Sequence, residues 1–275
     1  MASPCEVLIE PATEEAARAA IEAVAAEAWR VEDKFSRYLS GNIIDRINKS
    51  AGRAVPVDDE TARLLDFGAT LYELSDGGFD ITSGVLREVW KFDGSDRVPE
   101  PQAVAAVLER VGWNRVAWQP PVLTLRKGMQ IDLGGIGKEY AVDRCIAVLT
   151  SCIDAPGLVN FGGDLAVTGP PRARPSWKVA IEGPQEGTPE RVLDLRQGAI
   201  ATSGDARRFL SKNGVRYSHI LDPETGWPIA DAPRSVTVAA DTCTQAGMLS
   251  TLAMLQGAAA ESFLESQSVR YWCRR

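Results

Sequence analysis

The chain has 275 residues, enough to bury a substantial core as one large domain or two smaller ones. Apolar residues make up 45%, charged residues 24%, and the formal net charge is −7, which is typical of a globular protein. No run of Lys and Arg indicates a nucleic-acid surface, and no apolar stretch is long enough to span a membrane. Five cysteines without a C-x-x-C pair argue against a disulfide framework or a zinc knuckle.

The N-terminal residues, MASPCEVLIE, contain neither the basic segment nor the apolar segment of a signal peptide. The chain as written is therefore expected in the cytoplasm. If a signal segment had been removed from it, the periplasm would be expected instead.

The first part of the chain predicts one strand followed by helices. Alternating apolar residues favour a strand over 5–10, and Thr13 is placed to cap a helix that continues to Phe35. A second helix is expected over 57–78, with an aspartate as its N-cap and a glycine pair at its end. A third helix is expected over 99–112.

The later part of the chain is dominated by predicted strands. A hairpin is expected around the two prolines at 120 and 121. Residues 129–150 predict a strand, a glycine turn and a helix, and residues 234–257 predict a strand and a helix. Further strands are expected over 157–169, 176–184 and 191–205. This order favours an α+β fold with mostly antiparallel pairing rather than a regular β-α alternation.

Glycine-rich stretches are the first candidates for binding. In IDLGGIGKEYAVD (131–143), the glycines allow a ligand to approach the backbone, the helix start offers free N–H groups, and Lys138 adds positive charge. A plain strand-turn-helix explains this stretch equally well. SDGGFDITSG (75–84) suits a loop around a cofactor, although a helix end accounts for its glycines.

Two further polar stretches have simple structural explanations. NFGGDLAVTG (160–169) is best interpreted as a tight hairpin. In AIATSGDARRF (199–209), an apolar strand is expected to end and a helix to begin. The hydroxyls of Thr202 and Ser203 would then cap that helix or hold an anion.

His219 is the single histidine of the chain, within GVRYSHILDPETGWPIAD (214–231). A Pro-Glu-Thr-Gly turn follows it closely. Taken alone, a lone histidine is more often a packing or surface residue than a catalyst. Its imidazole is nevertheless the side chain whose pKa lies nearest to physiological pH.

Seven motifs occur in order along the chain. They are FSRY, GGFDITSGVL, IDLGGIGKEYAVD, LVNFGGDL, IATSGD, YSHILDPETGWP and SVTVAADTCTQAGMLSTLAMLQG. Together they resemble the FAD:protein FMN transferase (ApbE) family, and the resemblance runs nearly end to end. It implies a single domain over 1–275 with an α+β fold, in which helices pack on antiparallel sheet and a cleft holds the flavin.

The resemblance implies an activity, its cofactors and a set of site residues. Members of this family use FAD and Mg²⁺ to attach FMN to a threonine hydroxyl of a partner protein, and they release AMP. The implied partner is a flavin-acceptor protein, an FMN-binding domain of a redox or electron-transport subunit. His219 lies in the family's H-x-[IL]-D-P pattern and is the implied catalytic residue. The implied flavin contacts are Met1, Tyr38, Gly78, Phe79, Asp80, Asp132, Lys138 and Leu221.

The resemblance also implies a metal site in the final helix, with the pattern A-D-A-L-[SA]-T. Here residues 246–251 read AGMLST, which places Gly247 at the aspartate of the pattern. The implied metal ligands that remain are the backbone carbonyl of Gly135 and the side chains of Ser250 and Thr251. Because Mg²⁺ relies on carboxylate oxygen, the missing aspartate predicts weaker binding.

Three explanations of Gly247 stay open. Another carboxylate, from Asp241, Asp164 or Asp205, reaches the metal. Alternatively, the FAD phosphates and Thr251 hold the metal, and the enzyme is slow. In the third case the chain is a flavin-binding or carrier protein with little or no transferase activity. The first hypothesis is the Mg²⁺-dependent transferase, and the alternative is the flavin-binding paralogue.

Overall fold

A six-stranded antiparallel sheet forms the centre of the computed structural model, which describes residues 3–10, 13–183, 188–205 and 208–275. Within these residues the strand order is β1-β5-β6-β9-β12-β13, and every neighbouring pair is antiparallel. In that order the strands are Cys5–Ile9, Gly157–Phe161, Asp164–Val167, Gly198–Gly204, Ser235–Ala240 and Arg270–Arg274. The predicted antiparallel α+β fold is confirmed.

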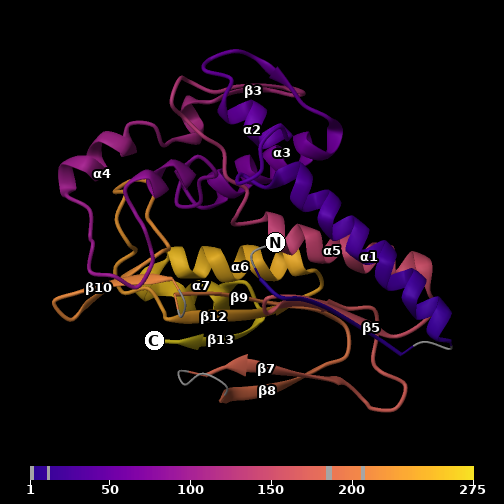
Figure 1. Cartoon of the computed structure of the whole chain (residues 1–275). Helices are drawn as coiled ribbons and strands as arrows, with labels where there is room; N and C mark the ends of the chain where they lie inside the picture. The colour runs from indigo at the N-terminus through magenta and orange to yellow at the C-terminus, as the bar shows by residue number, and fades with distance from the viewer. Residues whose placement is uncertain (1–2, 11–12, 184–187, 206–207) are drawn as a thin grey trace.

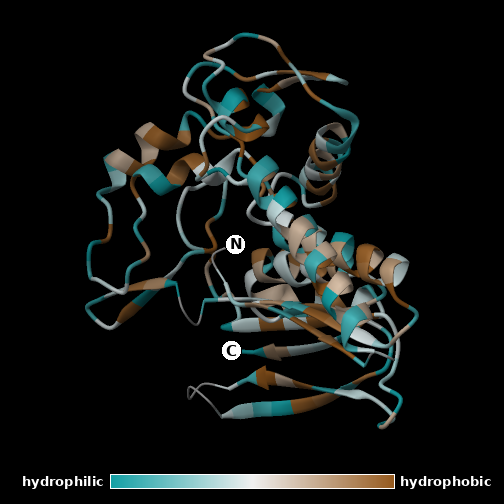
Figure 2. Cartoon of the chain, turned by 45° about the vertical axis from the view of Figure 1, so that its right-hand side comes forward, coloured by the Kyte–Doolittle hydropathy of each residue, from teal (hydrophilic) through white to brown (hydrophobic). Residues whose placement is uncertain are grey.

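Helices cover one face of this sheet and a hairpin covers the other (Figure 1). The helices on the first face are α1 (Glu14–Phe35), α5 (Gly137–Cys152) and α6 (Cys243–Leu255). The hairpin is β7 (Trp177–Glu182) with β8 (Pro189–Leu195). Buried and exposed residues alternate strictly along β7. Figure 2 shows both hydrophobic and hydrophilic segments on the two strands of this hairpin at the bottom of the view. The sheet therefore contributes to a hydrophobic core on each face.

A second group of short elements lies above the helices in Figure 1. Its helices are α2 (Ile43–Asn48), α3 (Asp59–Leu74), α4 (Pro101–Leu108) and the 3₁₀ helices η1 (Ser83–Glu88) and η2 (Trp113–Arg115). Its strands are β2 (Val55–Pro56), β3 (Ala117–Gln119) and β4 (Val122–Thr124). The remaining elements are the β10–β11 hairpin (Phe209–Lys212 and Val215–Ser218), η3 (Gly257–Ala259) and α7 (Ala260–Ser266).

A separate hydrophobic cluster fixes the segment that carries His219. Trp90 is 1% exposed and packs edge-on against Trp227. Its indole Nε1 also donates a hydrogen bond of 2.9 Å to the carbonyl of Gly226. Leu221 packs against the same cluster. The turn after His219 is thereby held to the residues that follow η1.

The predicted helix starts agree with the structure. The Thr13 side chain accepts a hydrogen bond from the backbone N–H of Ala16 at the start of α1. Asp58 caps α3 by accepting from the N–H groups of Glu60 and Thr61. These caps satisfy backbone donors that have no partner within the helix.

Two predicted elements are wrong. No strand forms over residues 129–133, because the backbone N–H groups are used outside a sheet. Ile131 donates to the Asn48 side chain and Asp132 donates to the carbonyl of Ile81. No helix begins in the described residues directly after β9 either, since Asp205 is tied to Arg216 of β11 and the chain continues as a hairpin from Phe209.

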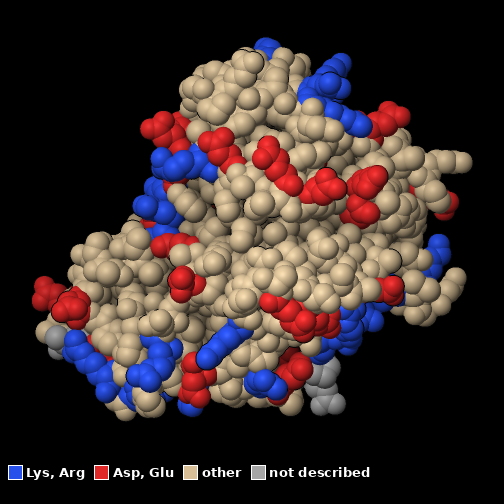
Figure 3. Space-filling model, turned by 180° about the vertical axis from the view of Figure 1, so that it is seen from behind, with Lys and Arg blue, Asp and Glu red and all other residues tan. Residues whose placement is uncertain are grey.

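Membrane and surface features of the described residues are unremarkable. None of the helices there combines the length and the apolar character that crossing a membrane requires. All five cysteines are free thiols, and Cys145 and Cys243 are buried. Figure 3 shows acidic and basic side chains interspersed over one face of the molecule.

Candidate functional site

The start of α5 brings a lysine to a buried aspartate of the central sheet. Lys138 Nζ lies 2.5 Å from Asp164 Oδ2, and Asp164 is 1% exposed. The other oxygen of Asp164 accepts a hydrogen bond of 3.0 Å from the backbone N–H of Thr202. Burial lowers the pKa of Lys138, but the charges of Asp164 and Glu139 and the hydrogen bond to Asp164 together outweigh it, and the pKa is raised. Lys138 therefore stays protonated in this partly desolvated position.

Glu139, the next residue, is buried between α5 and α6. It is 8% exposed, and its Oε2 atom has no hydrogen-bond partner among the described residues. Burial, and then the nearby charge of Asp164, raise the pKa of its carboxyl. A Cβ atom built on Gly247 would lie only 2.4 Å from Glu139 Cγ. Position 247 must therefore be glycine while Glu139 occupies this space.

Three hydroxyl groups meet on the sheet-facing side of α6. Ser203 Oγ lies 2.8 Å from Ser250 Oγ and 2.9 Å from Thr251 Oγ1. Ser250 also donates a hydrogen bond of 3.0 Å to the carbonyl of Gly247. Thr251 follows Gly247 by four residues in α6, which places both on one side of the helix. The structure thus brings together Ser250 and Thr251, two of the three residues predicted to bind metal.

Gly135, the third predicted metal ligand, lies in the exposed turn before α5. A Cβ atom on Gly135 would lie 3.0 Å from the ring of Phe79, so the turn packs closely on that aromatic side chain. No group of three His, Cys, Asp or Glu side chains is arranged for a metal ion in the part of the chain that the structure describes. The available donors are instead the Glu139 carboxylate with hydroxyl and carbonyl oxygens, which are the ligand types of a hard cation such as Mg²⁺.

Asp132 is bound between two arginines near an exposed tyrosine. Arg37 donates to Asp132 Oδ2 at 2.9 Å, and Arg87 lies 3.7 Å from the same oxygen. Tyr38 is 73% exposed, its hydroxyl accepts a hydrogen bond from Arg87, and the Arg87 guanidinium lies 5.7 Å from the centre of its ring. This group provides positive charge beside an aromatic ring that solvent reaches, a combination suited to an aromatic, anionic ligand.

The loop after α3 is braced from within. The backbone N–H of Gly78 donates a hydrogen bond of 3.0 Å to the carbonyl of Ser75. The side chain of the next residue, Phe79, is buried. Asp80, 6% exposed, accepts from the N–H of Thr82 at 2.7 Å and from that of Trp113 at 2.9 Å. Both oxygens of Asp80 are therefore engaged in holding the loop, and burial is the main cause of its raised pKa.

His219 is held in one orientation. Its Nδ1 lies 3.2 Å from the backbone carbonyl of Arg208, and its ring meets Phe92 edge-on at 6.2 Å between centroids. A carbonyl oxygen only accepts, so Nδ1 carries the proton and Nε2 of the neutral ring has a free lone pair. Burial and the charge of Arg208 lower the pKa of His219 to about 4. At pH 7 the imidazole is a neutral base.

The profile of the ApbE family matches residues 1–272. This chain belongs to the ApbE family. The FAD:protein FMN transferase of Treponema pallidum is 32% identical over 87% of this chain and 72% of its own length. That of Haemophilus influenzae is 30% identical over 87% and 72%.

Solved ApbE structures have the same fold. The ApbE protein of Thermotoga maritima superposes with a TM-score of 0.88 at 32% identity, covering 98% of this chain and 90% of the other. The apo form of the Pseudomonas stutzeri flavinyl transferase ApbE gives a TM-score of 0.82 at 27% identity, covering 98% and 91%. The predicted family and fold are confirmed.

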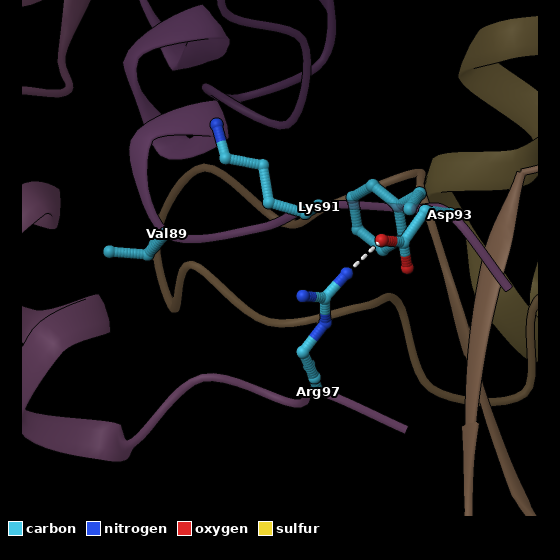
Figure 4. Close-up of a pocket in the computed structure, with 5 residues that line it drawn as sticks. Val89, Lys91, Asp93 and Arg97 are labelled. Carbon is cyan, nitrogen blue, oxygen red and sulfur yellow. Dashed lines mark hydrogen bonds and ion pairs between the residues drawn. The ribbon is translucent and has the colours of Figure 1, made fainter. Parts of the chain in front are cut away.

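An open surface pocket of about 490 Å³ lies on the segment that follows η1 in this ApbE chain. It is lined by Val89, Lys91, Phe92, Asp93 and Arg97. Figure 4 shows Arg97 pointing to Asp93, with which it forms an ion pair. Phe92, one of the residues that line this pocket, also meets the ring of His219 edge-on.

The structure adds residues that the sequence did not single out as part of the ApbE site. Glu139 is the largest omission, because its contact with Gly247 joins two helices far apart in sequence. Arg37 stands directly before Tyr38 in the FSRY motif, which was a usable signal. Arg87 follows the GGFDITSGVL motif directly. Met1 lies outside the described residues, and Leu221 is half-buried and bridged to Pro228.

Proposed function

We propose that this chain transfers FMN from FAD to a threonine hydroxyl of a flavin-acceptor protein, depends on Mg²⁺, and releases AMP. The observation that carries the proposal is the state of His219, whose ring is neutral at pH 7 with Nε2 free to accept a proton. The ApbE relatives named above bear the same activity in their names.

In the proposed reaction, the threonine oxygen forms a bond to the phosphorus of the FMN half of FAD. The bond from that phosphorus to the bridging oxygen breaks, and AMP departs with that oxygen. The threonine proton passes to Nε2 of His219. Arg37, Arg87 and Lys138 offer positive charge for the phosphates, which the overall charge of −7 does not supply. The other flavin contacts remain those proposed from the motifs: Met1, Tyr38, Gly78, Phe79, Asp80, Asp132 and Leu221.

The residues near α6 fit the implied Mg²⁺. The ion prefers oxygen ligands. Four such donors are at hand: Glu139 Oε2, which has no hydrogen-bond partner among the described residues, the hydroxyls of Ser250 and Thr251, and the backbone carbonyl of Gly135. Thr251, Ser250 and the Gly135 carbonyl would hold it beside the α5 carboxylate. When bound there, Mg²⁺ neutralises charge on the phosphate oxygens of the substrate.

The alternative is a flavin-binding protein of the same fold with little or no transfer. Gly247 favours it, because the family pattern has an aspartate at that position. Both proposals predict FAD binding, and only the first predicts a covalent product.

Covalent flavin on an acceptor domain is the decisive test. The chain is mixed with FAD, Mg²⁺ and an FMN-binding acceptor domain, and flavin fluorescence is followed on a denaturing gel. We expect a fluorescent band that is lost when the acceptor threonine is replaced by alanine. If FAD binds but no fluorescent band forms, the transferase proposal fails and the flavin-binding alternative stands.

The pH profile of transfer tests the state of His219 separately. Since its pKa is lowered to about 4, the neutral ring predominates from about pH 5 upward. We therefore expect kcat/KM to stay level between pH 5 and 7 and to fall only as the pH approaches 4. A histidine with its ordinary pKa, near 6.5, would produce the fall near that pH. A decline centred near pH 6.5 would contradict the depressed pKa.

A further inference from the structure

Glu139 on α5 faces the backbone of Gly247 on α6. We propose that Glu139 supplies the carboxylate of the divalent-cation site in this chain, in place of an aspartate at position 247. The inference deepens the proposed function by naming a ligand of the same site. The site would then keep its carboxylate, delivered by the opposite helix.

In the present conformation of Glu139, sterics prevent an aspartate at position 247 from sharing the space of the Glu139 carboxylate. A Cβ atom on residue 247 would lie 2.4 Å from Glu139 Cγ, 3.0 Å from Cδ and 3.1 Å from Oε1. The carboxyl carbon of an aspartate lies about 1.5 Å beyond its Cβ. The Glu139 carboxylate thus occupies the region into which an aspartate at 247 would extend. This explains a glycine in the middle of α6, where it costs about 1 kcal/mol relative to alanine.

The charges around Glu139 favour a bound cation. Glu139 and Asp164 are both buried, and Lys138 pairs with Asp164 at 2.5 Å. When both carboxyls are ionised, one lysine compensates only one of the two negative charges, and Oε2 of Glu139 has no hydrogen-bond partner in the described chain. A buried carboxylate in this state must either take up a proton or bind a cation.

Oxygen donors on the same side of α6 favour the cation over the proton. Thr251 lies one helical turn beyond Gly247, and its hydroxyl meets that of Ser203 at 2.9 Å. Ser250 is fully buried and shares the Ser203 hydroxyl. These neutral oxygens extend the donor set without adding charge, which suits an ion that takes most of its ligands from oxygen.

The carboxylates first considered for this role are engaged elsewhere. Asp205 is bound by Arg216 at 2.9 Å and by Arg234 at 3.2 Å. Asp241 is exposed and precedes the N-cap of α6. Asp164 has one oxygen on a backbone N–H and the other on Lys138. Asp164 Oδ2 has no hydrogen-bond partner among the described residues either, but it lies 2.5 Å from the Lys138 ammonium. Among the described residues, Glu139 Oε2 is therefore the buried carboxylate oxygen that lacks both a hydrogen bond and a paired cation.

Manganese binding tests the assignment without relying on catalysis. Mn²⁺ affinity of the full chain is measured by electron paramagnetic resonance, with Mg²⁺ as competitor. We expect Glu139→Gln, which preserves the shape of the side chain, to weaken Mn²⁺ binding at least tenfold. Asp143→Asn on the same helix is the matched control. Asp143 caps α6 by accepting from Cys243 and Thr244, and its variant should bind Mn²⁺ within twofold of the wild type.

Moving the carboxylate from position 139 to position 247 tests whether Mn²⁺ binding can be restored. Gly247→Asp alone collides with Glu139 and should not strengthen Mn²⁺ binding. Combined with Glu139→Gly, the same aspartate has room, and the double variant should recover Mn²⁺ affinity to within a few-fold of the wild type. Wild-type affinity in Glu139→Gln, or no Mn²⁺ binding by the wild type, would overturn the inference. Mn²⁺ binding without FMN transfer would instead overturn only the proposed function.

Discussion

Replacing His219 by alanine is expected to slow FMN transfer about 10²- to 10⁴-fold, the usual contribution of a general base. FAD affinity should change by no more than a few-fold, because the proposed role of the ring lies in accepting the threonine proton. The comparison is made on single-turnover transfer rates to an acceptor domain at saturating FAD. Such a result would place His219 at the chemical step rather than in binding.

A matched variant separates the base from the shape of the side chain. His219→Gln keeps a donor for the Arg208 carbonyl but has no basic nitrogen, so it should be as slow as alanine. Added imidazole should restore part of the rate in His219→Ala. Equal transfer rates in the alanine variant and the wild type would show that another group takes the proton.

Lys138→Met is expected to lower the free energy of unfolding by about 3–5 kcal/mol in metal-free buffer. The reason is that Asp164, whose side chain is 2% exposed, would lose the cation that lies 2.5 Å from its carboxylate. Urea unfolding followed by circular dichroism measures the effect.

The β7–β8 hairpin offers the control for this variant. Lys178 pairs with Asp194 at the same 2.5 Å, but both side chains are 58% exposed. Because solvent screens that ion pair, Lys178→Met should lower the free energy of unfolding by less than about 1 kcal/mol. If Lys138→Met and Lys178→Met lowered the free energy of unfolding equally, the burial of Asp164 would not explain the loss in Lys138→Met.

Local signals predicted much of the fold. Thr13 and Asp58 start helices because their side chains replace missing backbone partners, and this is a property of a few adjacent residues. The strand expected over 129–133 failed for the opposite reason. Its backbone donors find Asn48 and Ile81, partners that no pattern within the stretch reveals. Apolar alternation indicates a half-buried segment, but it does not guarantee a neighbouring strand.

The same distinction applies to the candidate site. Ser250 and Thr251 were predicted as metal ligands from a pattern within one helix, and both hydroxyls lie within hydrogen-bond distance of Ser203. Their role as metal ligands stays a prediction. Glu139 was missed because its partner, Gly247, belongs to another helix. The sequence did contain a signal, namely Gly247 in the middle of a predicted helix. Glycine is unfavourable there, and its presence indicates that a neighbouring side chain occupies the space where a Cβ atom would lie. Which neighbour fills it is a matter of packing between α5 and α6.

The close approach of Glu139 to Gly247 also constrains related sequences. With Cγ of one residue 2.4 Å from the Cβ position of the other, both positions cannot carry side chains of full size. Homologues with an aspartate at the position of Gly247 should therefore carry a small residue at the position of Glu139, and the two should covary. A family pattern that demands the aspartate on α6 would overlook members that hold the carboxylate on α5.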